Sequence, residues 1–343
     1  MDSWRLNHKP NGTFHEEFIG KVPMIEEKSL LYLGHVMSHD GRNLPNIIHK
    51  MKKSIGTQKQ IVKLVENLAL YAFQSAVIYI EALLRSSILY ASETMINVKE
   101  SDYRALEKIE ESVLQKIFKT NRSCSRHLLY LESGMIPARF QVQRQALNLL
   151  QYIIQQPTHS LLYRVFEALE KHPTKNDWLN CVKDSLKLFK INLTLQEIQI
   201  MKSTRFKHIV KIQASKAAFN YLKEKQAQGK KGKLIHYENL EMADYLLPEC
   251  SISVKDKIEM FSYRCEMNDL PNNFGKTDLC EFACNNLMNN EHLLQCVHLN
   301  KNELNKLTLE QLRNGNTNEK VEVLNKLKLN SSQRYKYILN KAL

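Results

Sequence analysis

Four residues near the carboxyl end of the chain have the types and the spacing of a zinc site. Cys280 and Cys284 are separated by three residues, His292 follows after seven more, and Cys296 after another three. Thiolate and imidazole groups from two short segments suit tetrahedral zinc coordination. His298 is an alternative ligand, but the spacing of His292 and Cys296 places both on one face of a helix. Because four protein ligands leave no open position for water, the expected zinc is structural rather than catalytic.

One stretch of the chain carries most of its excess positive charge. Residues 202–233 contain ten basic side chains and one acid, Glu224, which gives +9 of the total net charge of +13. On helices these cations would follow phosphates and give salt-sensitive binding to RNA or DNA without sequence preference. The side chains expected to bind there are Lys202, Arg205, Lys207, Lys211, Lys216, Lys223, Lys225, Lys230, Lys231 and Lys233.

Aromatic residues are interleaved with these cations. Phe206, Phe219 and Tyr221 are candidates for stacking on nucleic-acid bases. The alternative is a solvated helix face whose aromatic residues belong to the core. The near absence of acids favours binding, since ordinary solvated helices mix the two signs of charge. A second basic helix is expected after Pro45, and the lysines assigned to nucleic-acid binding on it are Lys50, Lys52 and Lys53.

Motifs that would support catalysis are missing from the sequence. It contains no Asp-Asp pair for two-metal phosphoryl transfer, and its acids are dispersed along expected helices. Phosphate-binding glycine loops, GxSxG and HExxH are absent as well. The sequence therefore predicts a protein that is not an enzyme.

Composition narrows the class of protein. A length of 343 residues suggests two or three domains, and the scarcity of Gly (10) and Pro (8) favours helices over an all-β fold. The net charge of +13 indicates an anionic partner, most often nucleic acid. The chain shows neither a secretory signal nor an apolar run of about 20 residues. We therefore expect reduced cysteines and a nuclear or cytoplasmic protein that is neither secreted nor bound to a membrane.

The elements that must position these residues follow from the pattern of apolar residues. Short strands are expected in the first 41 residues, including an apolar strand over Leu30–Val36, and a helical period begins near Leu44. On the helix after Ser101, the acids Glu107, Glu110 and Glu111 are expected to face water. The expected units are a β-hairpin region over 1–41, a helical domain over 42–171, a basic helical connector over 172–265, a Cys/His zinc module over 266–300 and a polar helical tail over 301–343.

Several short motifs, taken in order, resemble one protein family. Tyr32-Leu33-Gly34 precedes a basic amphipathic helix, and Ile88–Glu93 (ILYASE) resembles an L-x-YG-x-E segment in which Ala91 replaces the usual glycine. Leu129–Pro137 (LYLESGMIP) is similar to LY-x-E-x-G-x-x-P. Arg264–Pro271 (RCEMNDLP) and the Cys280–Cys296 segment resemble a terminal cysteine–histidine module. Together these motifs resemble the carboxyl-terminal part of non-LTR retrotransposon reverse transcriptases.

The resemblance implies a mainly α fold made of a hairpin left from the palm, a thumb and connector of several helices, and a small zinc module. The family's catalytic aspartates belong to the palm, which would lie upstream of residue 30. By the resemblance, nucleic-acid contacts fall on the helix after Pro45, the basic segment 202–233 and the zinc module.

Three functions stay open on the sequence. The first is a fragment derived from a reverse transcriptase that binds nucleic acid without catalysis. The second is a part of an active RNA-directed DNA polymerase whose palm lies upstream or on another chain. The third is a helical interaction protein in which the lysines only increase solubility.

Overall fold

The computed structural model shows a mainly helical protein with short antiparallel hairpins at the amino-terminal end, as the sequence predicts. It describes residues 18–19, 22–23, 28–39, 43–68, 72–96, 99–120, 124–174, 177–229, 237–250, 252–265, 267, 279–280, 286–296, 299, 311 and 315–342. The strands are β1 (Phe18–Ile19), β2 (Val22–Pro23), β3 (Ser29–Tyr32) and β4 (His35–Ser38).

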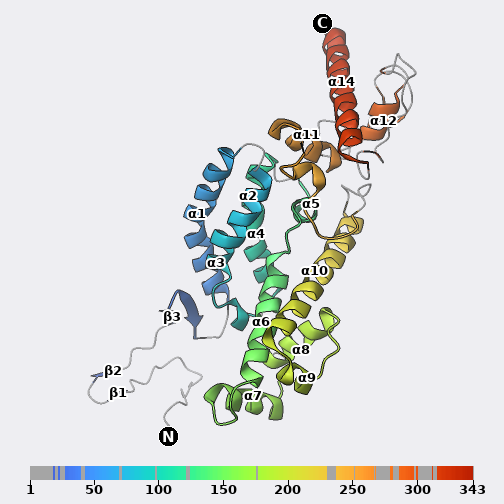
Figure 1. Cartoon of the computed structure of the whole chain (residues 1–343). Helices are drawn as coiled ribbons and strands as arrows, with labels where there is room; N and C mark the ends of the chain where they lie inside the picture. The colour runs from blue at the N-terminus through green and yellow to red at the C-terminus, as the bar shows by residue number, and fades with distance from the viewer. Residues whose placement is uncertain are drawn as a thin grey trace.

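Helices make up the body of the molecule (Figure 1). In chain order they are α1 (Leu44–Glu66), α2 (Ala72–Tyr79), the π-helical η2 (Ile80–Leu84), α3 (Arg85–Ile88), the 3-10 helix η3 (Ser92–Thr94), α4 (Glu100–Ile117), α5 (Arg126–Ser133), α6 (Ala138–Ile154), α7 (Leu161–Lys171), α8 (Trp178–Leu188), α9 (Leu195–Ile200), α10 (Ser203–Gln228), the 3-10 helix η4 (Asp244–Leu246), α11 (Val254–Arg264), α12 (Asn290–Gln295) and α14 (Thr317–Ala342).

The apolar run over Leu30–Val36 is a hairpin and not the single strand expected from its composition. Leu33 and Gly34 have φ values of 46° and 81°, so they form the two-residue turn between β3 and β4. A positive φ is unstrained for glycine, which explains why the turn falls there. Asn46 at the start of α1 holds the hairpin, because its side-chain oxygen accepts a hydrogen bond from the Val36 amide at 3.1 Å.

Helix α1 packs on α2, α3 and α4, whereas α10 packs on α5 and α6 (Figure 1). Helices α4 and α6 contact each other and so join the two groups. Helix α6 also contacts α7, α8 and α9, and its Gln151 donates hydrogen bonds to the carbonyls of Ile198 and Met201 at 3.1 and 3.0 Å. The two segments that the sequence divides at residue 171 are therefore packed together, because α6 contacts helices of both.

Three glutamates of α4 are buried, which corrects the expectation that they face water. Their exposed fractions do not exceed 4%, and each carboxylate binds an arginine at 2.5 to 2.6 Å. Helical periodicity assigned them to the surface because it does not register ion-pair partners, which lie on other helices for Glu107 and Glu110 and on α4 itself for Glu111. The pairs are Glu107 with Arg139, Glu110 with Arg85, and Glu111 with Arg104.

A polar cluster around Glu132 ties α5 to the carboxyl-terminal part of the fold. The carboxylate of Glu132 accepts hydrogen bonds from the hydroxyls of Tyr237 and Tyr245 and forms an ion pair with the Arg264 guanidinium. All four side chains are buried. Removal of one member would leave the buried charges or hydroxyls of the others without their hydrogen-bond or ion-pair partner. The cluster therefore favours one arrangement of these segments.

The carboxyl-terminal helices form one end of the molecule, where α14 lies beside α11 and α12 (Figure 1). Lys320 of α14 binds Asp244 at 2.7 Å, and Lys328 binds Glu259 at 2.9 Å. Buried apolar residues of α14, including Val323, also join the core, so the first half of this helix, expected to be a polar tail, is structural. In the described part of the chain, no helix combines the length and the apolar character needed to cross a membrane.

Candidate metal centre and nucleic-acid interface

Three of the four expected zinc ligands lie together at the end of the molecule formed by α11, α12 and α14. The ligand atoms of Cys280, His292 and Cys296 all lie within 4.8 Å of one another, and the three side chains are buried. The two sulfur atoms are 3.9 Å apart. Tetrahedral zinc with Zn–S bonds of about 2.3 Å requires a sulfur–sulfur distance of about 3.8 Å, so the pair is spaced for one ion.

Local structure explains how these residues meet. Asn289 caps α12 by accepting a hydrogen bond from the His292 amide at 2.8 Å, which fixes the first turn of this short helix. Cys296 follows the last residue of α12, one turn after His292. An antiparallel bridge between Leu279 and Leu287 brings Cys280 back to the same place.

The imidazole of His292 is arranged as a ligand would be. The residue is only 9% exposed, and its buried Nε2 atom has no hydrogen-bond partner among the described residues. Burial lowers the pKa of His292, which favours the neutral form that binds metals. A buried polar atom without a partner is rare in native proteins, and a metal ion would satisfy it. Two thiols and an imidazole are donors that zinc accepts well.

Cys284 and the alternative ligand His298 lie outside the described residues. The group that the structure brings together is therefore Cys280, His292 and Cys296, which could hold a metal ion.

Helix α10 carries most of the expected nucleic-acid contacts. Its buried residues repeat every fourth position from Phe206 to Leu222, and Lys207, Lys211 and Lys223 each follow one of these buried positions. Lys207 and Lys211 therefore lie on one flank of the helix, about 40° apart, whereas Lys223, sixteen residues after Lys207, lies about 160° around the helix from it. The exposed cations of this segment are Lys202, Arg205, Lys207, Lys211, Lys216 and Lys223, and Lys225 is half-buried. Lys230, Lys231 and Lys233 lie outside the described residues.

The cations of α10 are not neutralised by neighbours. Within the described ranges, none of them forms an ion pair with a carboxylate. At the start of α5, the Nε atom of Arg126 donates a hydrogen bond to the Nε2 atom of His127 at 3.2 Å. Burial, followed by the charges of Arg126, Arg104 and Lys225, lowers the pKa of His127 to about 4.

The aromatic residues of α10 do not form the expected stacking platform. Phe206 is fully buried, because it belongs to the stripe that packs on the core. Tyr221 lies under the guanidinium of Arg139 at 4.8 Å and against the ring of Phe140 at 5.6 Å. Phe219 is half-buried, with the Lys223 amine 5.3 Å from its ring centre. Interaction with nucleic acid on α10 would thus rest on charge.

Of the three lysines expected to bind on α1, two are exposed and one is not. Lys52 and Lys53 face solvent. Lys50 is only 2% exposed and donates hydrogen bonds to the carbonyls of Ile88, at 3.1 Å, and of Tyr90. Burial lowers the pKa of Lys50 to about 8. Lys50 therefore caps the end of α3 and is withdrawn from the interface that the sequence assigned to it.

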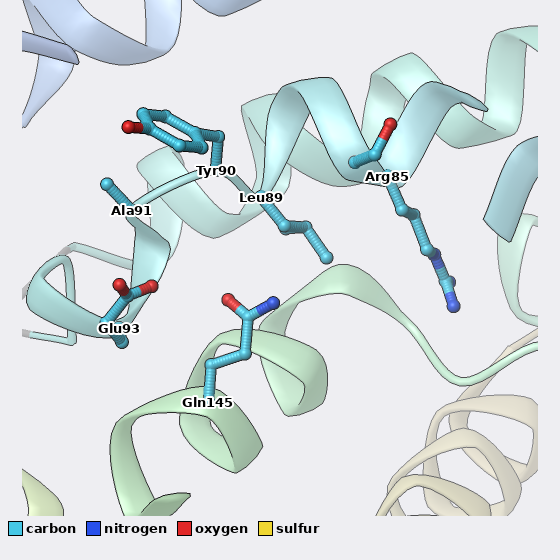
Figure 2. A pocket seen from close by; sticks show the side chains of 7 residues that line it. Arg85, Leu89, Tyr90, Ala91, Glu93 and Gln145 are labelled. Carbon is cyan, nitrogen blue, oxygen red and sulfur yellow. The ribbon is translucent and has the colours of Figure 1, made fainter. Parts of the chain in front are cut away.

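A surface pocket of about 350 Å³ lies between α6 and the segment 85–93, which carries one of the sequence motifs (Figure 2). Gln145 of α6 points toward Leu89 across it, and its amide oxygen accepts a hydrogen bond from Ser92. The guanidinium of Arg85 is bound by Glu110, Glu81 and the Ile136 carbonyl. The side chains of Arg85 and Gln145 are thus engaged in the fold, and we assign the pocket no chemistry.

No family model, curated protein or solved structure matches this chain. Function is therefore inferred from the side chains and their arrangement.

The buried contacts of Glu132 and Arg264 are not predicted by the sequence, which places these two residues only within motifs. The signal that could have marked Glu132 is its place directly after the apolar residues Leu128–Leu131, whereas α11 around Arg264 is too polar to give such a signal.

Proposed function

We propose that this chain binds nucleic acid, without sequence preference, through the exposed cations of α10, and that a zinc ion stabilises its carboxyl-terminal end. The observation that carries the proposal is the set of exposed lysines Lys207, Lys211 and Lys223 on α10, none of which has a carboxylate partner among the described residues. Along the helix axis Lys207 and Lys211 are about 6 Å apart, and Lys211 and Lys223 about 18 Å apart, since each residue rises about 1.5 Å. Unpaired cations spread along a helix in this way can contact the phosphates of a nucleic-acid backbone.

The zinc ion belongs to the same proposal. Cys280, His292 and Cys296 would hold it, with Cys284 as the fourth ligand. Bound zinc would cross-link the segment of Cys280 to the helix of His292 and Cys296, and its binding free energy would add to the free energy of folding. With four protein ligands the ion would be structural.

We include descent from a non-LTR retrotransposon reverse transcriptase in the proposal, on the strength of the motifs over Ile88–Glu93 and Leu129–Pro137. We also propose that the chain has no polymerase activity of its own. In support, the clustered acids of α4 are bound by arginines and so are not available to hold magnesium ions. An active polymerase with a palm upstream or on another chain is the competing possibility.

Protein interaction is a second candidate function, favoured by one observation. Helix α7 exposes an apolar stripe in which Leu161 is 77% and Val165 is 50% exposed. Apolar surface of this kind marks interaction sites when it is contiguous.

A titration of the full-length, zinc-loaded protein with fluorescent duplex DNA and duplex RNA tests the proposal. With about three phosphate contacts, the logarithmic salt slope is about −2.7, and raising salt from about 50 to about 200 mM weakens binding about 40-fold. Primer extension with nucleotides and magnesium is expected to give no product. Folded protein that fails to bind at low salt would overturn the proposal and favour protein interaction, and extension product would favour the polymerase.

A further inference from the structure

A second basic surface lies on α1, apart from the one on α10. Four lysines of this helix are exposed, namely Lys52, Lys53, Lys59 and Lys63. Its single acidic residue is Glu66, at the end of the helix. None of these four lysines has a carboxylate partner among the described residues. Lys52, Lys59 and Lys63 are seven and four residues apart, spacings that place them on one face of the helix.

Gly56 lies on the same face, in the middle of the helix. It is four residues after Lys52 and three before Lys59. Glycine in a helix interior is less stable than alanine by about 1 kcal/mol. The fold does not require it, since a Cβ atom built at Gly56 would meet nothing within 4 Å. The absence of a side chain between lysines allows the backbone of a ligand to approach the helix closely.

The two basic helices lie on opposite sides of the helical body. In Figure 1, α1 runs along one edge and α10 along the other, with α4 and α6 between them. The contacts agree with this view, because α1 packs on α4, α4 packs on α6, and α6 packs on α10. Duplex nucleic acid lying along α10 would therefore leave the outward face of α1 free.

We propose that α1 is a second nucleic-acid surface, formed by Lys52, Lys53, Lys59 and Lys63 around Gly56, and that one chain joins two nucleic-acid segments. The inference rests on the proposed function, since α10 supplies the first surface. The ligand recognised on α1 is a phosphate backbone, because the surface offers lysine amines and an open helix backbone.

A bridging experiment tests this inference. Biotinylated duplex DNA on beads captures the full-length, zinc-loaded protein, and unbound protein is washed away before a fluorescent second duplex is added. The wild-type protein is expected to retain the second duplex. A parallel arm with duplex RNA shows whether either surface prefers one nucleic acid.

The decisive variant is Lys59→Gln/Lys63→Gln, with Lys171→Gln/Lys187→Gln as a control of equal charge change. The control lysines are exposed and paired with Glu167 and Asp184. The α1 variant should still be captured by the beads through α10, but retain the second duplex about 60-fold more weakly at 0.1 M salt, since each lost contact removes a factor of about 8. The control should bridge like the wild type.

Gly56→Leu separates binding from stability. It is expected to raise the melting temperature while reducing capture of the second duplex. Equal bridging by wild type, Lys59→Gln/Lys63→Gln and Gly56→Leu would overturn the inference. Two copies of α10 in an oligomer would then explain how the protein joins two duplexes. Capture on the beads without retention of a second duplex would refute the second surface alone. Failure of the wild type to bind the beads would refute the proposed function and this inference together.

Discussion

The Nε atom of Arg264 lies 2.9 Å from the Oε1 atom of Glu132, and both side chains are buried. The pair joins α5 to α11, two elements that are more than a hundred residues apart in sequence. The hydroxyls of Tyr237 and Tyr245 complete the polar surroundings of the carboxylate. Glu132 is therefore a structural residue, whose contacts hold the end of the protein that carries Cys280, His292 and Cys296 on the helical body.

Loss of the Glu132 carboxylate is expected to destabilise the fold strongly. Glu132→Ala leaves the Arg264 guanidinium buried without its partner, a change that costs about 3–5 kcal/mol. The exposed pair of Asp184 and Lys187 provides the control, because Asp184→Ala should cost less than about 1 kcal/mol. Urea unfolding measures both, and equal midpoints for the two variants would show that the buried pair contributes nothing particular.

Two glycines should respond in opposite directions to alanine. Gly134 has a φ of +69°, and a Cβ atom there would meet the backbone of Glu241 and Met242 at 3.0 Å or less. Gly134→Ala should lower the free energy of unfolding by more than about 1 kcal/mol, since it combines an unfavourable φ with a clash. Gly56→Ala should raise it by up to about 1 kcal/mol, because its position is open and helical. Thermal melts that shift both variants in the same direction would contradict these roles.

The buried Lys50 predicts a particular pH dependence of stability. Its pKa is about 8 in the folded protein, against an ordinary lysine value of 10.5, so the unfolded chain binds more protons between these two values. Stability contributed by this group therefore rises as pH increases from about 8 to about 10.5, by up to about 3 kcal/mol. The difference in unfolding free energy between wild type and Lys50→Met should show this rise. The difference between wild type and Lys53→Met should stay flat, and a flat curve for Lys50→Met would refute the buried position.

Metal content tests the Cys/His group. The purified protein should contain about one zinc ion per chain, and Cys280→Ser or Cys296→Ser should lose it. Cys181→Ser on α8 is the control and should keep the ion, because this half-buried cysteine is not part of the group. Chelation should release the ion and increase hydrogen exchange in α12. Elemental analysis of protein purified without chelators that finds no metal would exclude the site.

The sequence predicted those features that depend on nearby residues. The start of α1 follows from Pro45, and the meeting of His292 with Cys296 follows from one turn of helix. The turn at Leu33 and Gly34 was missed, because an apolar run hides the change of direction. Its signal was the glycine itself.

Features that depend on distant partners were mispredicted. Glu107 and Glu110 were placed in water because their arginines lie on other helices. Lys50 was assigned to the basic face of α1, although its distance of three residues from Ile47 and four from Ser54 places it on the buried face. Charge alone led to that error, and helical position would have corrected it.

The central claim, that α10 binds phosphate backbones, is tested most directly by the salt dependence of duplex binding in three proteins measured together. The Lys207→Gln/Lys211→Gln variant should show a logarithmic salt slope about 1.8 less steep than that of the wild type. The control Lys171→Gln/Lys187→Gln, which removes the same charge from paired lysines, should keep the wild-type slope. Equal slopes for all three proteins would contradict the claim.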